Sequence, residues 1–401
     1  MNIIIKFYCR GFQLAFRLAM PLLPYREPER FDSIQALPPL LERLKVRSVL
    51  LVTDKSLREA GVTRPLEELL ERSGVHCDVY DDNRSNPTVH NVEEARARYL
   101  AEDCKGLIAF GGGSPMDCAK AAGARIVYPK RSLDRLKGLL KVWRRLPPLI
   151  AIPTTAGTGS EVTVTAVITD PEKKHKYTMN NFTMIPRYAV LDPEVTRTLP
   201  PSLTATTGVD ALTHAVEAYI GGSTTKETRR LAREAVRLVF ENLETAYQNG
   251  GDMTARKKML HAAHIAGIAF SKSYVGYIHA VAHSLGGQYN TPHGLANAVL
   301  LPIGLESYGP CVHRKLWELG RCAGVVDADT PVAEGAAQFI AAIRGLNKRL
   351  NIPEKLPEIK REDIPKMAAY AAKEANPLYP VPKLMDRLEL ARLYELAADW
   401  S

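Results

Sequence analysis

The order of apolar and polar positions changes character along the chain. Between about residues 46 and 191, short β-branched apolar runs alternate with stretches of helical periodicity. The runs predict buried strands, and the longer stretches predict amphipathic helices. We expect strands at 46–53, 75–80, 106–110, 149–152, 162–169 and 188–191 and helices at 58–73, 92–103 and 114–128. This alternation is typical of a parallel sheet with helices on both faces.

The pattern changes at Leu199-Pro200-Pro201. Beyond it the β-branched runs nearly vanish, and long helical patterns follow at 226–247, 254–270, 330–350 and 388–398. The sequence therefore predicts an N-terminal amphipathic arm at 1–30, an α/β domain at 31–200 and an all-α domain at 201–401.

The first 25 residues are rich in Ile, Leu, Phe and Met. Lys6, Arg10 and Arg17 interrupt them, so no uncharged run reaches the ~20 residues of a spanning helix. In a helix these cations and Gln13 form one polar stripe, and the other faces are apolar. Such a helix can lie on an anionic membrane surface. Packing against its own domain or a partner subunit is the favoured interpretation, because amphipathic helices mostly face a core.

Composition narrows the class of protein. Apolar residues make up 46% and charged residues 24% of the 401, as in ordinary globular proteins. The net charge of +9 comes without a dense basic run beyond the N-terminus, so we expect a mildly basic surface and no nucleic-acid partner. The six cysteines form no CxxC pair and no disulfide framework, which favours a reducing, cytoplasmic location.

A glycine-rich segment follows the expected strand at 106–110. Gly111-Gly112-Gly113-Ser114-Pro115-Met116-Asp117 leads into a helix, where free backbone N–H groups make an anion site. Ser114 is expected to cap this helix, with Asp117 completing a capping box. The segment departs from GxGxxG at Met116, so a tight strand-to-helix turn with a good cap is the alternative interpretation.

Two further loops follow strands that belong to the same expected sheet. The segment 153–161 (PTTAGTGSE) is dense in hydroxyl groups and glycine, which suits a phosphate or a ribose. Asp54 follows the first expected strand, where a carboxylate accepts from a ribose 2′-OH and repels a 2′-phosphate. Asp54 therefore favours NAD over NADP, although a plain helix cap or turn would use the same residue.

Carboxylate and imidazole side chains recur between residues 210 and 293. Asp210 and His214, like His279 and His283, are four residues apart and so share one helix face, and His293 follows in Thr-Pro-His-Gly. One carboxylate with several imidazoles and no thiolate suits Fe(II), Zn(II), Co(II) or Mn(II), which polarise a carbonyl or alcohol oxygen. Spacing leaves open which four of the five bind an ion. His261 and His264, at i,i+3, are interpreted as packing and surface residues.

Five ordered motifs, from about residue 30 to the C-terminus, resemble the iron-containing, long-chain alcohol dehydrogenases. They are GGGSPMDCAK (111–120), AIPTTAGTGSEVT (151–163), TGVDALTHAVEAY (207–219), HAVAHSLGGQYNTPHGLANAVLLP (279–302) and NPLYPVP (376–382). The resemblance implies a dehydroquinate synthase-like fold, with an α/β NAD-binding domain, an all-α metal-binding domain and the active site between them. It also implies a dimer or a larger homo-oligomer.

The resemblance implies roles for individual residues. Asp210, His214, His279 and His293 would bind Fe(2+), with Zn(2+) also possible, and His283 would lie nearby in a proton relay. The residues placed around NAD would be Asp54, Asn86, Gly112, Gly113, Ser114, Asp117, Thr154, Thr155 and Thr158. Lys272 and Tyr274 are bulkier than the small residues common before the third ligand, so they would alter the substrate pocket if they faced it.

Together these features predict reversible NAD-dependent oxidation of a primary alcohol or diol to its aldehyde. A zinc polyol or glycerol-type dehydrogenase is the first alternative. A lyase resembling dehydroquinate synthase expects several Arg and Lys side chains near the ligands, and few are present. A non-catalytic scaffold would not need the complete ligand set.

Overall fold

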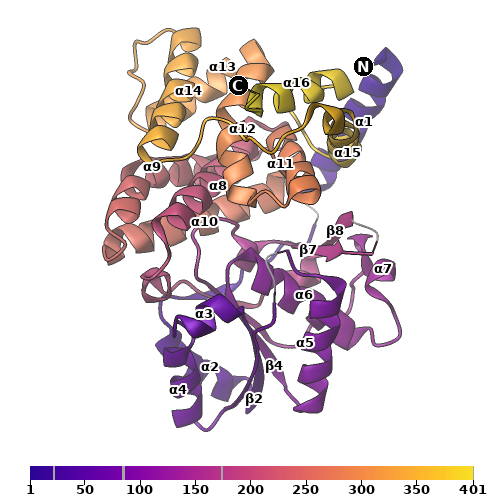
Figure 1. Ribbon diagram of the computed structural model, residues 1–401, viewed down its shortest axis with the longest axis vertical. Helices are drawn as coiled ribbons and strands as arrows, with labels where there is room; N and C mark the ends of the chain where they lie inside the picture. Colours follow the sequence, from indigo (N-terminus) through magenta and orange to yellow (C-terminus); the bar gives the residue numbers. More distant parts are fainter. Residues whose placement is uncertain (21–22, 84–85, 173–174, 401) are drawn as a thin grey trace. The chain divides into compact units, whose positions relative to one another are not determined.

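The computed structural model describes residues 1–400 except 21–22, 84–85 and 173–174. Its chain divides into two compact units, which are residues 24–199 and residues 1–23 together with 200–401. The first unit carries the sheets, and the second is helical (Figure 1). The predicted combination of a parallel α/β domain and an all-α domain is confirmed.

A six-stranded parallel sheet forms the centre of the α/β unit. Its strand order is β1 (Glu29–Phe31), β9 (Tyr188–Val190), β6 (Leu149–Pro153), β4 (Gly106–Gly111), β2 (Ser48–Val52), β3 (His76–Tyr80). A smaller three-stranded sheet contains β5 (Gly138–Leu139), β8 (His175–Asn180) and β7 (Thr165–Asp170).

Alternate residues of the central strands supply two separate cores. On β2, Leu50 and Val52 enter one hydrophobic cluster while Val49 and Leu51 enter the other. The first cluster lies under α5 (Val89–Ala101) and α6 (Gly113–Val127), and the second lies under α2 (Leu37–Arg43) and α4 (Arg64–Arg72) (Figure 1). Burial on both faces explains why these strands are continuous apolar runs.

Three local expectations for this unit were wrong. The single helix expected at 58–73 is two helices, α3 (Lys55–Glu59) and α4, because Gly61 adopts a positive φ of 72° and Pro65 lies in the first turn of the next helix. The strand expected at 162–169 begins only at Thr165, after a 3₁₀ turn at Ser160–Val162. Strand β8 was missed because its polar sequence carries no apolar run. Helix α7 (Leu133–Leu136) completes the unit.

The helical unit is built on three helices in mutual contact, α8 (Pro201–Ile220), α9 (Lys226–Gln248) and α10 (Met253–Ser273). Helices α11 (Tyr277–Tyr289) and α12 (His293–Tyr308) follow, and α12 packs on α8. Helices α13 (His313–Cys322), α14 (Val332–Arg349), α15 (Ile364–Ala375) and α16 (Arg387–Ala397) follow along the chain.

Helix α1 (Ile3–Ala19) packs against the other helices of its unit through the side that carries Cys9, Gln13 and Phe16. Gln13 is buried and donates to the carbonyl of Tyr379 at 2.7 Å, and Arg10 donates to the carbonyls of Val381 and Pro382 at 2.7 and 2.9 Å. Helix α1 thus packs against its own domain, as the favoured interpretation expected, while its large apolar side chains are mostly exposed. Among the described residues, no helix is both long and apolar enough to cross a bilayer.

Candidate metal centre and nucleotide site

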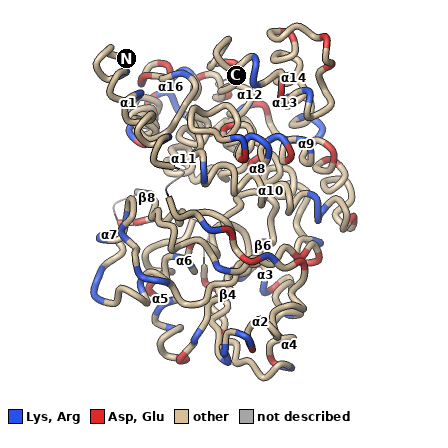
Figure 2. The backbone as a smooth tube through the Cα atoms, turned by 180° about the vertical axis from the view of Figure 1, so that it is seen from behind, with Lys and Arg blue, Asp and Glu red and all other residues tan. Residues whose placement is uncertain are grey.

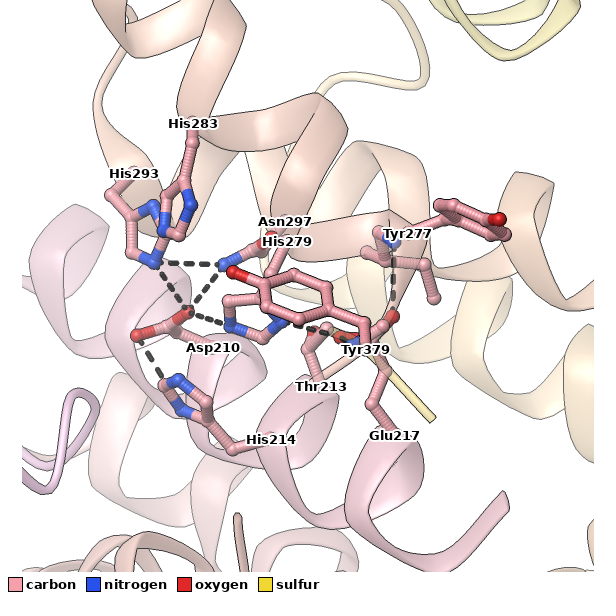
Figure 3. A network of polar contacts seen from close by, with 12 residues as sticks. Asp210, Thr213, His214, Glu217, Tyr277, His279, His283, His293, Asn297 and Tyr379 are labelled. Carbon is pink, nitrogen blue, oxygen red and sulfur yellow. Dashed lines mark hydrogen bonds and ion pairs between the residues drawn. The ribbon is translucent and has the colours of Figure 1, made fainter. Parts of the chain in front are cut away.

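Three helices bring one carboxylate and three imidazoles to a common point. Asp210 and His214 lie one turn apart on α8, His279 lies on α11, and His293 is the first residue of α12 (Figure 3). One potential ligand atom from each residue lies within 4.8 Å of the others. The structure thus brings together the four residues that the family resemblance had singled out among the five candidates.

The atoms that face this point lack hydrogen-bond partners within the described part of the chain. They are Oδ2 of Asp210, Nδ1 of His214 and Nε2 of His279, and all three residues are buried. Asp210 approaches the imidazole nitrogens of His214, His279 and His293 no closer than 3.9, 3.9 and 3.6 Å. Buried polar atoms are rarely left unpaired, so these orphaned atoms fit a bound cation.

The protonation states of these groups suit a cation as well. Burial lowers the pKa of His279 to about 3 and that of His214 to about 4, so both imidazoles are neutral at pH 7. Burial would raise the pKa of Asp210, but the neighbouring histidines and a hydrogen bond from Asn297 outweigh it and leave the pKa lowered. One anionic oxygen and neutral imidazoles are the donors that Fe(II) and Zn(II) accept.

Two buried side chains hold these donors in place. Glu217 lies 2.6 Å from Nδ1 of His279 and accepts from the backbone N–H groups of Gly276 and Ile278 at 2.8 and 2.9 Å. Asn297 donates from Nδ2 to Oδ1 of Asp210 at 2.7 Å. Neither residue was predicted from the sequence, although Glu217 lies seven positions after Asp210 on the same helix.

His283 lies beside the four-residue cluster and has a partner of its own. Its ring stacks on that of His293 with centroids 5.2 Å apart, and its Nδ1 lies 2.6 Å from Oε1 of Glu374. Glu374 also accepts from the Tyr379 hydroxyl at 2.8 Å. Glu374 and Tyr379 were not predicted from the sequence. They lie 91 and 96 positions after His283, and no local pattern indicates a contact between such distant residues.

The other residues considered from the sequence lie outside this cluster. Lys272 pairs with Glu227 of α9 at 2.8 Å. Tyr274 packs between two aromatic rings, with centroids 5.1 Å from Phe16 and 6.1 Å from Tyr379. His261 lies 3.7 Å from Glu234, and neither it nor His264 belongs to the four-residue cluster.

The expected nucleotide residues follow the carboxyl ends of neighbouring parallel strands. Asp54 comes after β2, Asn86 after β3, the glycine segment after β4, and residues 154–158 after β6. Parallel pairing places these ends at one edge of the sheet, where open α/β sheets bind ligands.

Two of these loops pack closely enough to form a backbone cradle. A Cβ added at Gly113 would lie 3.0 Å from Cγ2 of Thr158, and one at Gly112 would lie 3.4 Å from the Thr155 side chain. The Thr154 N–H donates to the carbonyl of Gly111 at 3.0 Å. Glycine therefore lets the two loops meet, and α6 begins there without a side-chain cap.

The capping box expected at Ser114 and Asp117 is absent from this segment. The N-cap of α6 is Gly112, and Ser114 instead accepts from the N–H of Asn86 at 3.2 Å. Asp117 accepts from the Ser160 hydroxyl and from the N–H of Val167, both at 3.0 Å. Its carboxylate therefore anchors the 153–163 loop to α6, assisted by buried Lys120, which donates to Ser160, Thr163 and Thr165.

Asp54 caps a helix, which was the alternative interpretation of this residue from the sequence. It is the N-cap of α3, and its Oδ1 accepts from the Leu57 N–H at 3.0 Å and from the Ser56 hydroxyl. Because both of these hydrogen bonds use Oδ1, a ribose contact would use the other oxygen.

Family models match both units of the chain. Residues 30–193 match the model described as iron-containing alcohol dehydrogenase, and residues 204–398 match the C-terminal model of the Fe-containing alcohol dehydrogenase family. Helix α1 precedes both matches.

Named relatives cover most of the chain. A 1,3-propanediol dehydrogenase of Klebsiella pneumoniae is 37% identical over 88% of this chain and 91% of the relative. A lactaldehyde reductase of Escherichia coli K12 is 35% identical over 84% of this chain and 89% of the relative.

Solved structures agree in fold. The crystal structure of a 1,3-propanediol oxidoreductase superposes with a TM-score of 0.90 at 35% identity, covering 94% of this chain and 99% of that one. A sulfoacetaldehyde reductase from Bifidobacterium kashiwanohense, solved in complex with NAD+, superposes with a TM-score of 0.83 at 27% identity over the same shares.

Proposed function

Because the chain belongs to the iron-containing alcohol dehydrogenase family, we propose that it interconverts a primary alcohol or diol and its aldehyde with NAD as hydride carrier. The observation that carries this proposal is the convergence of Asp210, His214, His279 and His293, three of whose facing atoms are buried without partners. Relatives named for propanediol and lactaldehyde chemistry support a short, hydroxylated substrate.

The four converging residues hold the metal in this proposal, with Fe(2+) as the native ion and Zn(2+) as the alternative. When bound, the ion supplies Lewis acidity that polarises the substrate oxygen. Glu217 accepts the proton on Nδ1 of His279, which leaves the lone pair on Nε2 directed at the ion site. Asn297 fixes Asp210 in the same way through Oδ1 and leaves Oδ2 for the ion.

His283 is the proposed proton acceptor during alcohol oxidation. Glu374 engages Nδ1 of the ring, so the neutral tautomer presents an unprotonated Nε2 that can take the hydroxyl proton of the alcohol. The Tyr379 hydroxyl holds the Glu374 carboxylate in position. This arrangement of a base oriented by a carboxylate is the usual way in which proteins fix a histidine tautomer.

The edge of the parallel sheet is the proposed NAD site. The α6 N-terminus with Gly112, Gly113 and Ser114 receives the pyrophosphate, which favours free N–H groups and the positive end of a helix. Thr154, Thr155 and Thr158 lie in the loop after β6, which faces the glycine segment. Asn86 lies beside Ser114. The remaining oxygen of Asp54 contacts the ribose and repels a 2′-phosphate. NAD supplies the hydride acceptor.

Two properties of the assembled protein belong to the same proposal. We propose a homodimer or larger homo-oligomer, as the family resemblance implies. We also propose a reducing, cytoplasmic location, which the free thiols of all six cysteines support.

The proposal is tested by removing metal with a chelator and restoring Fe(II) or Zn(II) under anaerobic conditions. NADH absorbance is followed with ethanol, butanol, 1,2-propanediol, 1,3-propanediol and glycerol. We expect metal-dependent NADH formation with a short diol or primary alcohol, and preference for glycerol with Zn(II) would favour the polyol dehydrogenase alternative. His214→Gln should abolish turnover. His261→Gln is the control, because it makes the same replacement outside the four-residue cluster, and it should leave turnover intact. Absence of turnover with every alcohol and metal, despite NAD binding, would contradict the proposal.

A further inference from the structure

Helix α1 exposes an apolar face that its own chain does not cover. Ile4 and Phe7 are each 73% exposed and Leu18 is 69% exposed. The full set of exposed large apolar residues on this helix is Ile3, Ile4, Ile5, Phe7, Tyr8, Phe12, Leu14 and Leu18. At roughly 100 Å² each, these eight side chains together expose more than the few hundred Å² above which an exposed apolar patch marks an interaction site.

The opposite side of α1 is fixed to the helical unit. Cys9 and Gln13 are buried there, Gln13 and Arg10 donate to backbone carbonyls at 379–382, and Phe16 meets the Tyr274 ring edge-on. These contacts use the side of the helix that carries Cys9, Gln13 and Phe16, so the protein itself stabilises the orientation that leaves the other apolar side chains outward. The apolar face can therefore be covered from outside without displacing the helix from its seat.

Charge decides between the two occupants that suit this face. A second copy and a lipid surface could each bury an apolar area of this size. The helix has no acidic residue (Figure 2), and its Lys6 and Arg17 are both exposed. In a pairing of two α1 helices these cations would meet no acidic partner on the other copy, whereas an anionic headgroup layer supplies one.

We propose that the apolar face of α1 is a docking surface for an anionic lipid bilayer. The helix lies in the plane of the bilayer surface, with Phe7, Leu18 and their neighbours among the acyl chains and with Lys6 and Arg17 at the headgroups. This attachment is peripheral and independent of the catalytic proposal, because the helix precedes the segments that match the enzyme family.

The test is flotation of the full-length protein with vesicles of phosphatidylcholine alone or phosphatidylcholine mixed with phosphatidylglycerol. We expect at least tenfold more bound protein on the mixed vesicles, falling as salt rises because surface charge is screened. Phe7→Glu/Leu18→Glu should lower binding at least tenfold. Leu100→Glu/Trp143→Glu adds the same charge at exposed apolar residues of the other unit and should leave binding unchanged.

Three results would overturn the proposal. The first is wild-type protein that fails to float with the mixed vesicles, and the second is Phe7→Glu/Leu18→Glu protein that floats as well as wild type. The third is a light-scattering mass, measured without lipid, that falls in Phe7→Glu/Leu18→Glu but not in the control variant. That result would assign the face to a second copy of the chain. Circular dichroism of each variant verifies that the helices remain formed.

Discussion

Replacing Glu217 by Gln should weaken metal binding through a side chain that does not touch the metal. The carboxylate receives three hydrogen bonds, from His279 Nδ1 and from the N–H groups of Gly276 and Ile278. A glutamine has one oxygen and one NH₂ group in their place. If the amide oxygen still accepts from His279 and Gly276, the NH₂ group faces the N–H of Ile278. Two donors cannot bond to each other, so that buried N–H loses its partner.

The size of the effect follows from these contacts. Loss of a partner that orients a metal-binding histidine costs roughly 10- to 100-fold in metal affinity. That range corresponds to about 1.4 to 2.7 kcal/mol. The unpaired Ile278 N–H adds about 1–3 kcal/mol of destabilisation to the folded protein.

The assay is competition for Zn(II) or Co(II) against a chelator of known affinity, with thermal unfolding of the metal-free protein measured in parallel. Glu374→Gln is the matched control, because Glu374 contacts His283 rather than any of the four converging residues. We expect weaker binding in Glu217→Gln and unchanged binding in Glu374→Gln. Equal metal affinity in wild type and Glu217→Gln would refute the reasoning about His279.

Further predictions concern the backbone at the site, the proton acceptor and the cofactor. Gly276→Ala places a Cβ 2.5 Å from Oε1 of Glu217 and should lower stability by about 1–3 kcal/mol, measured by chemical unfolding, with loss of bound metal. Glu374→Gln should lower kcat by ~10²–10⁴ while NAD affinity, measured by NADH fluorescence, stays constant. Unchanged kcat would remove His283 and Glu374 from proton transfer. Asp54→Ala should raise the use of NADP relative to NAD and cost about 1 kcal/mol through the lost helix cap. An unaltered cofactor ratio would leave Asp54 as a cap alone.

Sequence patterns predicted the central strands well because those strands are buried on both faces. β2, β4 and β6 are continuous apolar runs, and each lies within two residues of its expected position. β8 and the division between α3 and α4 were missed. The first is a polar strand paired antiparallel with β7, and the second depends on the backbone at Gly61, which periodicity does not register.

The candidate metal centre was predictable where spacing within a helix fixes geometry. Asp210 and His214 share a face of α8 and do lie together. Contacts between distant segments were not predictable, and they include those of Glu374 with His283 and of Asp117 with Ser160 and Val167. For α1, packing against its own domain was the favoured interpretation, but the contacts of Gln13 and Arg10 with carbonyls at 379–382 were not predictable, because those residues are distant in the sequence. The roles of individual site residues stay predictions.

The most direct test of the central claim is anaerobic titration of the metal-free protein with Co(II), followed by visible absorption. We expect a stoichiometric endpoint and a spectrum typical of nitrogen and oxygen ligands in wild type and in His261→Gln. We expect no tight binding in Asp210→Asn or His279→Gln. Tight stoichiometric binding that survives Asp210→Asn and His279→Gln would contradict the claim that Asp210, His214, His279 and His293 hold the metal.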